Sequence, residues 1–191
     1  MTKIKILFAL VFVFQAFLFA QTAEEQYQKG NSLYDQANFD EAFKLYDEAI
    51  RLKPDYQEAY YMRGKVFDVK MKFDDALKDY NKALELKPGY VDVLNDRGTL
   101  YFKTKKYSDG MLDYNKVLEI DPKNSAAYYF KGSAYVFFLS VPDSALLNLD
   151  KAIEYDPNFK IALNLRGTIY LMRLDYDKAF NDANAAIAID P

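Results

Sequence analysis

The chain has 191 residues, 51% of them hydrophobic, with 25 Lys and Arg against 28 Asp and Glu and a formal net charge of −3. It is long enough to form one ordinary domain with a buried core. It has no Cys and no His, which excludes disulfides, thiolate nucleophiles, most zinc sites and histidine-dependent triads. Carboxylates, Lys and Tyr remain as possible acids and bases. We expect no catalytic residue, cofactor or metal, and the balanced charge predicts no nucleic-acid partner.

The N-terminus has the pattern of a secretory signal peptide. Two lysines precede an apolar run from Ile6 to Ala20 that ends at a small residue, as is typical of such peptides. We predict that residues 1–20 are removed, that Gln21 becomes the N-terminus, and that the chain is exported to a periplasm or the extracellular space. The alternative is an uncleaved membrane anchor, but the run contains Gln15 and is shorter than the roughly 20 apolar residues of a spanning helix.

The rest of the chain repeats itself about every 34 residues. A glycine column consists of Gly30, Gly64, Gly98, Gly132 and Gly167, and a proline column consists of Pro54, Pro88, Pro122, Pro157 and Pro191. Two further columns are small or nearly so: Ala42, Ala76, Gly110, Ala145 and Ala179, and Ala49, Ala83, Val117, Ala152 and Ala186. Such a period is the signature of a repeat architecture. The repeats span 23–56, 57–90, 91–124, 125–159 and 160–191.

Each repeat is predicted to contain two helices. In the second repeat, apolar and aromatic residues recur at helical spacing from Glu58 to Val69, and a second such segment follows a short polar turn. We expect the second helices to be capped by Asp40, Asp74, Ser108, Asp143 and Asp177 and to end before the prolines. The small columns predict close helix contacts, such as Gly64 against Ala76.

The period and the Gly, Ala and Pro columns, with stretches such as Tyr61-Met62-Arg63-Gly64, resemble the tetratricopeptide repeat family over residues 23–191. The resemblance implies an all-α, right-handed solenoid of about five helix-turn-helix repeats. It also implies a concave groove, lined by the first helices, that holds peptides or partner proteins.

The basic residue before each column glycine predicts an ion pair inside the repeat. Arg63, Arg97 and Arg166 occur in the three repeats whose second helix carries Asp79, Asp113 and Asp182. Lysine stands before the glycine in the other two repeats, where the matching residue is Leu45 or Asn148. This covariation favours a bidentate Arg–Asp pair. The alternative is a basic stripe that binds an acidic ligand.

The resemblance places three columns of side chains in the groove. The first consists of Tyr27, Tyr61, Asn95, Tyr129 and Asn164, and the second of Asn31, Lys65, Thr99, Ser133 and Thr168. The third consists of Tyr34, Asp68, Phe102, Val136 and Leu171. Amide and aromatic side chains suit an extended peptide. The tyrosines can equally pack against the next repeat, whereas Asn95 and Asn164 favour the groove because amides gain little from packing.

Two further features suggest other contact sites. The fourth repeat has one extra residue and an apolar turn from Val136 to Pro142, which either packs inward or forms a second contact surface. The fifth repeat ends at Pro191 without a polar capping helix, so either the chain is part of a longer protein or this end meets a partner or a second copy. The leading hypothesis is therefore an exported scaffold or adaptor that binds protein or peptide. The alternative is a structural component that self-associates or joins a membrane-associated assembly.

Overall fold

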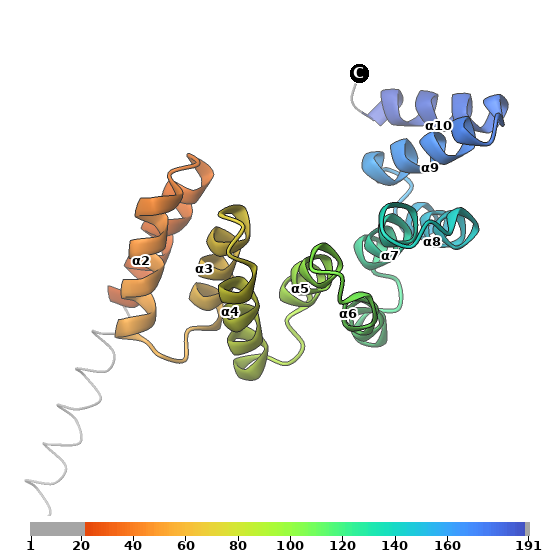
Figure 1. Ribbon diagram of the computed structural model, residues 1–191. Coiled ribbons are helices and arrows are strands. Elements are labelled where there is room, and N and C mark those ends of the chain that lie inside the picture. Colours follow the sequence, from red (N-terminus) through yellow and green to blue (C-terminus); the bar gives the residue numbers. More distant parts are fainter. Residues whose placement is uncertain (1–21, 190–191) are drawn as a thin grey trace, which may run out of the picture. The chain divides into compact units, whose positions relative to one another are not determined.

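A computed structural model describes residues 22–189, and within that range the chain is built from helices joined by short turns (Figure 1). The predicted signal peptide, the membrane-anchor alternative and Pro191 lie outside the described residues. A helix over residues 22–35 comes first. It is followed by α2 (Phe39–Leu52), α3 (Gln57–Val69), α4 (Phe73–Leu86), α5 (Val91–Lys103), α6 (Tyr107–Ile120), α7 (Ser125–Phe137), α8 (Pro142–Tyr155), α9 (Lys160–Met172) and α10 (Tyr176–Ile189). Residues 22–189 contain no strand, and the all-α solenoid is confirmed.

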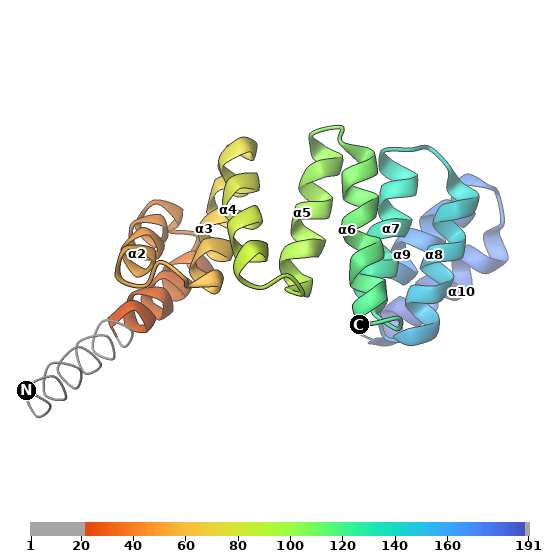
Figure 2. The ribbon, with the colours of Figure 1, turned by 90° about the horizontal axis from the view of Figure 1, so that it is seen from below.

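The contacts between these helices fall into two compact units, which divide between Val93 and Leu94. In the first unit α3 packs against α2 and α4, and the helix over 22–35 lies beside α2. In the second unit α7 packs against α8, α8 against α9, and α9 against α10 (Figure 2). Among the helices within 22–189, none combines the length and apolar character required to cross a membrane.

The second helices end where the sequence predicts but begin one or two residues earlier than expected. α2, α4, α6 and α8 stop two residues before the column prolines. The predicted caps were wrong: Asp40 and Asp74 lie in the first turn of α2 and α4, and the cap positions are Asn38 and Lys72, neither with a side-chain cap bond. The acids still face the positive end of the helix dipole, which explains their place in the repeat.

The turn inside each repeat contains one residue in the left-handed region of backbone conformation. These residues are Ala37, Met71, Lys105, Ser140 and Leu174, with φ between 55° and 62°. None is glycine, although glycine adopts this conformation most readily. In all five repeats this residue lies two positions before the first residue of the second helix.

The glycine column lies close to the small column, as we expected: a Cβ at Gly132 would lie 3.3 Å from the Ala145 oxygen, and one at Gly110 would lie 2.8 Å from the Gly98 oxygen. It also makes room for a large side chain, which we did not predict. A Cβ added to Gly64 would lie 2.7 Å from the Tyr80 ring. Gly30 and Gly98 make the same room for Tyr46 and Tyr114. These three tyrosines are among the largest fully buried side chains. The first three repeats thus each hide a tyrosine ring between their two helices by leaving out one Cβ, whereas Leu149 takes that place against Gly132 in the fourth repeat.

Candidate functional site

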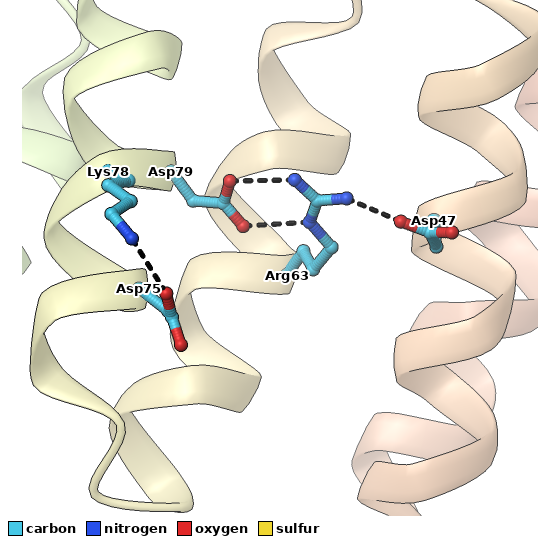
Figure 3. Close-up of polar contacts among 5 residues, drawn as sticks. All are labelled: Asp47, Arg63, Asp75, Lys78 and Asp79. Atoms are coloured by element: carbon cyan, nitrogen blue, oxygen red, sulfur yellow. Dashed lines mark hydrogen bonds and ion pairs between the residues drawn. The ribbon is translucent and has the colours of Figure 1, made fainter.

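The basic residues before the glycines hold the helices together. Arg63 on α3 donates from Nε and Nη2 to the two carboxylate oxygens of Asp79 on α4, both at 2.8 Å. Its remaining nitrogen, Nη1, donates to Asp47 on α2 at 2.5 Å (Figure 3). One guanidinium therefore joins three helices, because it pairs with its own repeat and with the preceding one.

The second unit repeats this arrangement. Arg97 and Arg166 each make a bidentate pair, with Asp113 and Asp182, at 2.6 to 2.9 Å. Arg166 also donates to Asp150 of the preceding repeat at 2.7 Å. The predicted Arg–Asp pairs are confirmed in all three repeats. The bond to the preceding repeat was not predicted.

Electrostatics agree with a structural role for these arginines. The hydrogen bond to Asp182 raises the pKa of Arg166, against an opposing effect of burial, and Asp150 raises it further. Burial raises the pKa of Asp79, although its bonds from Arg63 act to lower it. Arg63, Arg97 and Arg166 direct their guanidinium groups at aspartates rather than at a ligand, and Lys131 donates to Asn115. The stripe alternative is therefore disfavoured.

The first unit brings three predicted groove residues together. The ammonium of Lys65 lies 5.4 Å from the ring centres of both Tyr34 and Tyr61. Tyr34 belongs to the first repeat, and the other two residues belong to the second. The groove columns of these two consecutive repeats therefore form one surface, on which a half-buried cation lies over two aromatic rings.

The column tyrosines also pack against the start of the next repeat. Tyr27 lies 5.1 Å from Tyr56, and Tyr61 lies 5.3 Å from Tyr90, measured between ring centres. In the second unit Tyr129 lies 5.4 Å from Phe159. All three column tyrosines remain half-buried. Both expected roles are compatible with this geometry, because each ring packs with one part and leaves another part accessible.

Burial raises the pKa of Tyr27 and of Tyr129 above the ordinary value, so both phenols stay neutral and can donate a hydrogen bond at physiological pH.

Two residues of the second column have partners inside their own repeat. Asn31 accepts a hydrogen bond from the Tyr46 hydroxyl at 2.9 Å. The Thr99 hydroxyl lies 3.0 Å from that of Tyr114 and donates to the backbone oxygen of Asn95 at 3.0 Å. These contacts fix the buried tyrosines over the glycines. Asn31 and Thr99 thus have a structural function besides any role in binding.

The amides of the second unit differ in exposure. Asn95 is only 6% exposed, and its side-chain oxygen is buried without a hydrogen-bond partner. Asn164 and Thr168 on α9 are exposed, and the Thr168 hydroxyl donates to the backbone oxygen of Asn164. Ser133 is half-buried and donates to the backbone of Phe130. In this unit Asn164, Thr168 and Leu171 are the predicted groove residues that are exposed to solvent.

The third column is more buried than expected in one repeat. Phe102 is 1% exposed and stacks on Tyr114, with ring centres 5.8 Å apart and planes 9° apart. Phe102 is therefore a core residue of the second unit. The large ring fits because residue 110 is glycine, where a Cβ would come within 2.5 Å of Phe102.

The apolar turn of the fourth repeat is largely exposed, although one of its rings contacts a core residue. Phe138 packs on Phe102 at 5.4 Å between ring centres, whereas Phe137 is 66% exposed. Beside the turn is a mainly apolar cavity of about 330 Å³, lined by Val136, Ser140, Pro142, Ile169, Met172 and Arg173. The contribution of the fifth repeat to this cavity was not predicted. The extra apolar residues of the turn were its signal in the sequence.

Residues 22–189 contain no group of three or more acidic residues placed to hold a metal ion. Their polar side chains are arranged along helix faces, which suits recognition of an extended surface.

Comparisons with known proteins agree with this architecture. A family model described as tetratricopeptide repeat matches residues 27–91, 71–125 and 140–191. No curated protein matches the chain.

Solved structures with a similar fold include pilF of Pseudomonas aeruginosa, with a TM-score of 0.79 and 17% identity over 91% of this chain and 78% of that one. PilW, described as a type IV pilus biogenesis factor, has a TM-score of 0.77 and 17% identity over 88% and 78% of the two chains. YrrB, described as having an unusual peptide-binding site, has a TM-score of 0.60 and 24% identity over 91% and 92%. At such identities the likeness concerns the fold.

Proposed function

The chain belongs to the tetratricopeptide repeat family, and from this premise we propose that it is a non-enzymatic scaffold that binds a protein or peptide along its first helices. The cluster of Lys65 with Tyr34 and Tyr61 is the observation that carries the proposal. It joins side chains of two repeats on one surface that is only partly buried. Such a surface offers a cation and aromatic ring faces to a ligand.

The second unit supports the same function with different groups. Asn164 and Thr168 are exposed on α9, and an Asn side chain can both donate to and accept from a peptide backbone. Tyr129 adds a half-buried ring on α7. We therefore propose that the binding residues are Tyr27, Asn31, Tyr61 and Lys65 in the first unit and Asn95, Thr99, Tyr129, Ser133, Asn164 and Thr168 in the second unit. Three of these residues are Asn31, Asn95 and Thr99. They act mainly by positioning the buried tyrosines or by accepting a hydrogen bond from a ligand that reaches inward.

We infer that the scaffold works outside the cytoplasm. The two lysines and the apolar run before Gln21 support export with cleavage after Ala20. Sequencing the N-terminus of the protein from fractionated cells tests this inference. A chain that begins at Gln21, or within a few residues of it, supports export. An intact Met1 in the membrane fraction would favour the anchor instead.

Site-directed photocrosslinking in the source cell tests the groove. A photoreactive residue at position 164 or 168 should crosslink to a discrete partner, and one at Lys151 on the second helix α8 should not. Lys65→Ala should reduce the amount of partner protein that is crosslinked through the first unit. Lys82→Ala on α4 is its matched control. Equal crosslinking at positions 164 and 151, or capture unchanged by Lys65→Ala, would contradict the groove.

A further inference from the structure

The turns that join the two helices of each repeat form one edge of the second unit. They run from the last residue of a first helix to the first residue of a second helix and cover residues 103–107, 137–142 and 172–176. Figure 2 shows the first two of these turns at the same end of their helices. Neighbouring turns are in contact: the ring centres of Tyr107 and Phe138 are 6.4 Å apart, and Arg173 donates to Asp143 at 2.7 Å. We call these three turns the turn edge.

Two turns of the turn edge expose large apolar side chains. The exposed fractions are 66% for Phe137, 41% for Val141, 76% for Met172 and 70% for Leu174. Large apolar side chains that gather at the surface mark a binding site.

This exposure does not depend on where the sequence ends. Phe137 is the last residue of α7, and it is exposed although the fifth repeat follows it. Met172 has the same position in α9. Leu174 is the left-handed residue of its turn, and the matching residues of two interior repeats, Met71 and Lys105, are exposed as well. A following repeat would therefore leave this edge uncovered.

The turn edge is also basic. Its three turns contain four basic residues and one acidic residue: Lys103, Lys105, Lys106, Arg173 and Asp175. All four basic residues are exposed, and Asp175 pairs with Lys178 at 2.7 Å. The next acidic residues lie in the first turns of the second helices: Asp109, Asp143 and Asp177.

The opposite edge of the second unit lacks this combination. Its turns, residues 120–125 and 155–160, contain two acidic and two basic residues. Ile120 is the one large apolar residue exposed in these two described turns. In the first unit, one turn inside a repeat again combines the two features, because the exposed Val69 and Met71 alternate with the exposed Lys70 and Lys72. Apolar and basic residues thus gather at such turns in both units.

We propose that the turn edge of the second unit binds the surface of a lipid bilayer that contains anionic phospholipids. Phe137, Met172 and Leu174 enter the boundary between headgroups and acyl chains. Lys105 and Lys106 lie at the level of the lipid phosphates and attract the anionic surface. This binding is independent of the groove, which is lined by the first helices.

Two observations favour a bilayer over the surface of a folded protein. The exposed apolar side chains project from separate turns, so a rigid partner would need a hollow for each turn, whereas fluid lipid adapts to both. The mainly apolar cavity that Pro142 and Met172 help to line lies between two of the turns and offers room for part of an acyl chain.

Co-sedimentation with lipid vesicles tests the proposal. The protein comprises residues 21–191, because the apolar run from Ile6 to Ala20 would itself bind lipid. This chain contains every helix that the structure describes over residues 22–189, and circular dichroism checks that each variant is folded. We expect binding to vesicles of phosphatidylglycerol and phosphatidylcholine in equal parts, and little binding to vesicles of phosphatidylcholine alone.

The basic residues are tested with two variants of equal charge. Lys105→Gln/Lys106→Gln should weaken binding to the anionic vesicles by about tenfold or more, because each basic residue near the surface adds to the attraction. Lys116→Gln/Lys123→Gln removes the same charge from exposed positions away from the turn edge. This control should change binding by about twofold at most, since salt screens more distant charges.

The apolar residues are tested by their depth in the bilayer. The chain has no Trp, so Phe137→Trp introduces a single fluorescent reporter. Its emission should shift to shorter wavelength on binding and should be quenched by lipids brominated on their acyl chains. Ile120→Trp, on the opposite edge, should show neither effect. Phe137→Ser/Leu174→Asn should also weaken binding by about tenfold or more, whereas Leu112→Ser, at another exposed apolar position, should not.

Each result has a contrary outcome. Equal losses of binding in the edge variants and their controls, or equal quenching at positions 137 and 120, would overturn the proposal. Absence of binding to both kinds of vesicle would also overturn it and would leave the edge to a protein partner. Lys65→Ala should leave vesicle binding unchanged, so the turn edge and the groove are tested separately.

Discussion

At the scale of single residues, the glycine column offers two positions with opposite expectations. A Cβ at Gly64 would lie 2.7 Å from the Tyr80 ring, whereas at Gly167 the nearest atoms are the Asp182 Cβ at 3.3 Å and the Ala179 oxygen at 3.6 Å. Gly64→Ala should lower the free energy of unfolding by about 1–3 kcal/mol, since overpacking forces the ring to move. Gly167→Ala should be neutral or stabilising by up to about 1 kcal/mol, because alanine favours helix.

Urea unfolding of both variants and the parent, followed by circular dichroism, checks the pair. The two substitutions add the same methyl group to the same position of the repeat, so each is the control for the other. Equal losses of stability would show that the ring contact does not decide the outcome.

The two aspartates that bind Arg63 should differ in importance. The Asp79 side chain is 8% exposed and accepts two hydrogen bonds, whereas that of Asp47 is 59% exposed and accepts one. Asp79→Leu should cost about 2–4 kcal/mol of unfolding free energy, because it leaves a largely buried guanidinium without its main partner. Asp47→Ala should cost about 0–1 kcal/mol, as exposed pairs do.

Chemical denaturation of the two single variants and of Arg63→Leu/Asp79→Leu measures these costs. The double variant should recover part of the loss from Asp79→Leu, since no charge is then left buried. Unchanged stability in Asp79→Leu would contradict a structural pair.

The sequence predicted the bidentate pairs because Arg and Asp vary together within one chain. It held a second signal that went unused: positions 47, 81, 115, 150 and 184 are all Asp or Asn. That column accepts from the base of the next repeat, as at Asp47 and Asp150. The partner of Gly64 could not be predicted from composition, because Ala76 and Tyr80 lie one turn apart on the same helix.

At the scale of elements, the turn within each repeat contains strain that can be relieved. Met71 has φ of 58° and is 74% exposed. A non-glycine residue in the left-handed region destabilises the folded state by roughly 1–2 kcal/mol. Glycine avoids this steric cost, but it loses more conformational freedom on folding, which offsets part of the gain. Met71→Gly should therefore raise the unfolding free energy by up to about 1 kcal/mol.

The neighbouring residue provides the control. Lys70 has φ of −82°, so Lys70→Gly gains no steric relief and should destabilise by about 0.5–1 kcal/mol. Thermal unfolding of the two variants at equal pH distinguishes them. A loss of stability in both would show that the Met71 side chain contributes more than its backbone conformation costs.

The element boundaries show where sequence reasoning failed. Asp40 and Asp74 were expected to be caps because acids favour both the cap position and the first turn. The structure places them in the first turn, after Asn38 and Lys72. Within residues 22–189, α7 has a side-chain cap, in which Asn124 accepts from the backbone of Ala127 at 2.9 Å. Stacking of neighbouring repeats supplies the stability that the other helices do not gain from caps.

At the scale of the whole molecule, stability should vary along the repeats. In the second unit α8 packs against both α7 and α9, whereas α10 packs against α9 and exposes Phe180 and Ile187. Repeat arrays gain stability from each neighbouring interface. A helix with one such interface should therefore open locally more often than a helix with two.

Amide hydrogen exchange measured by mass spectrometry tests this difference. Amides of α10 should exchange about ten to a hundred times faster than those of α8, which corresponds to roughly 1.4–2.8 kcal/mol of local stability. Equal protection of α8 and α10 would mean that α9 alone holds α10 as firmly as two neighbours hold α8.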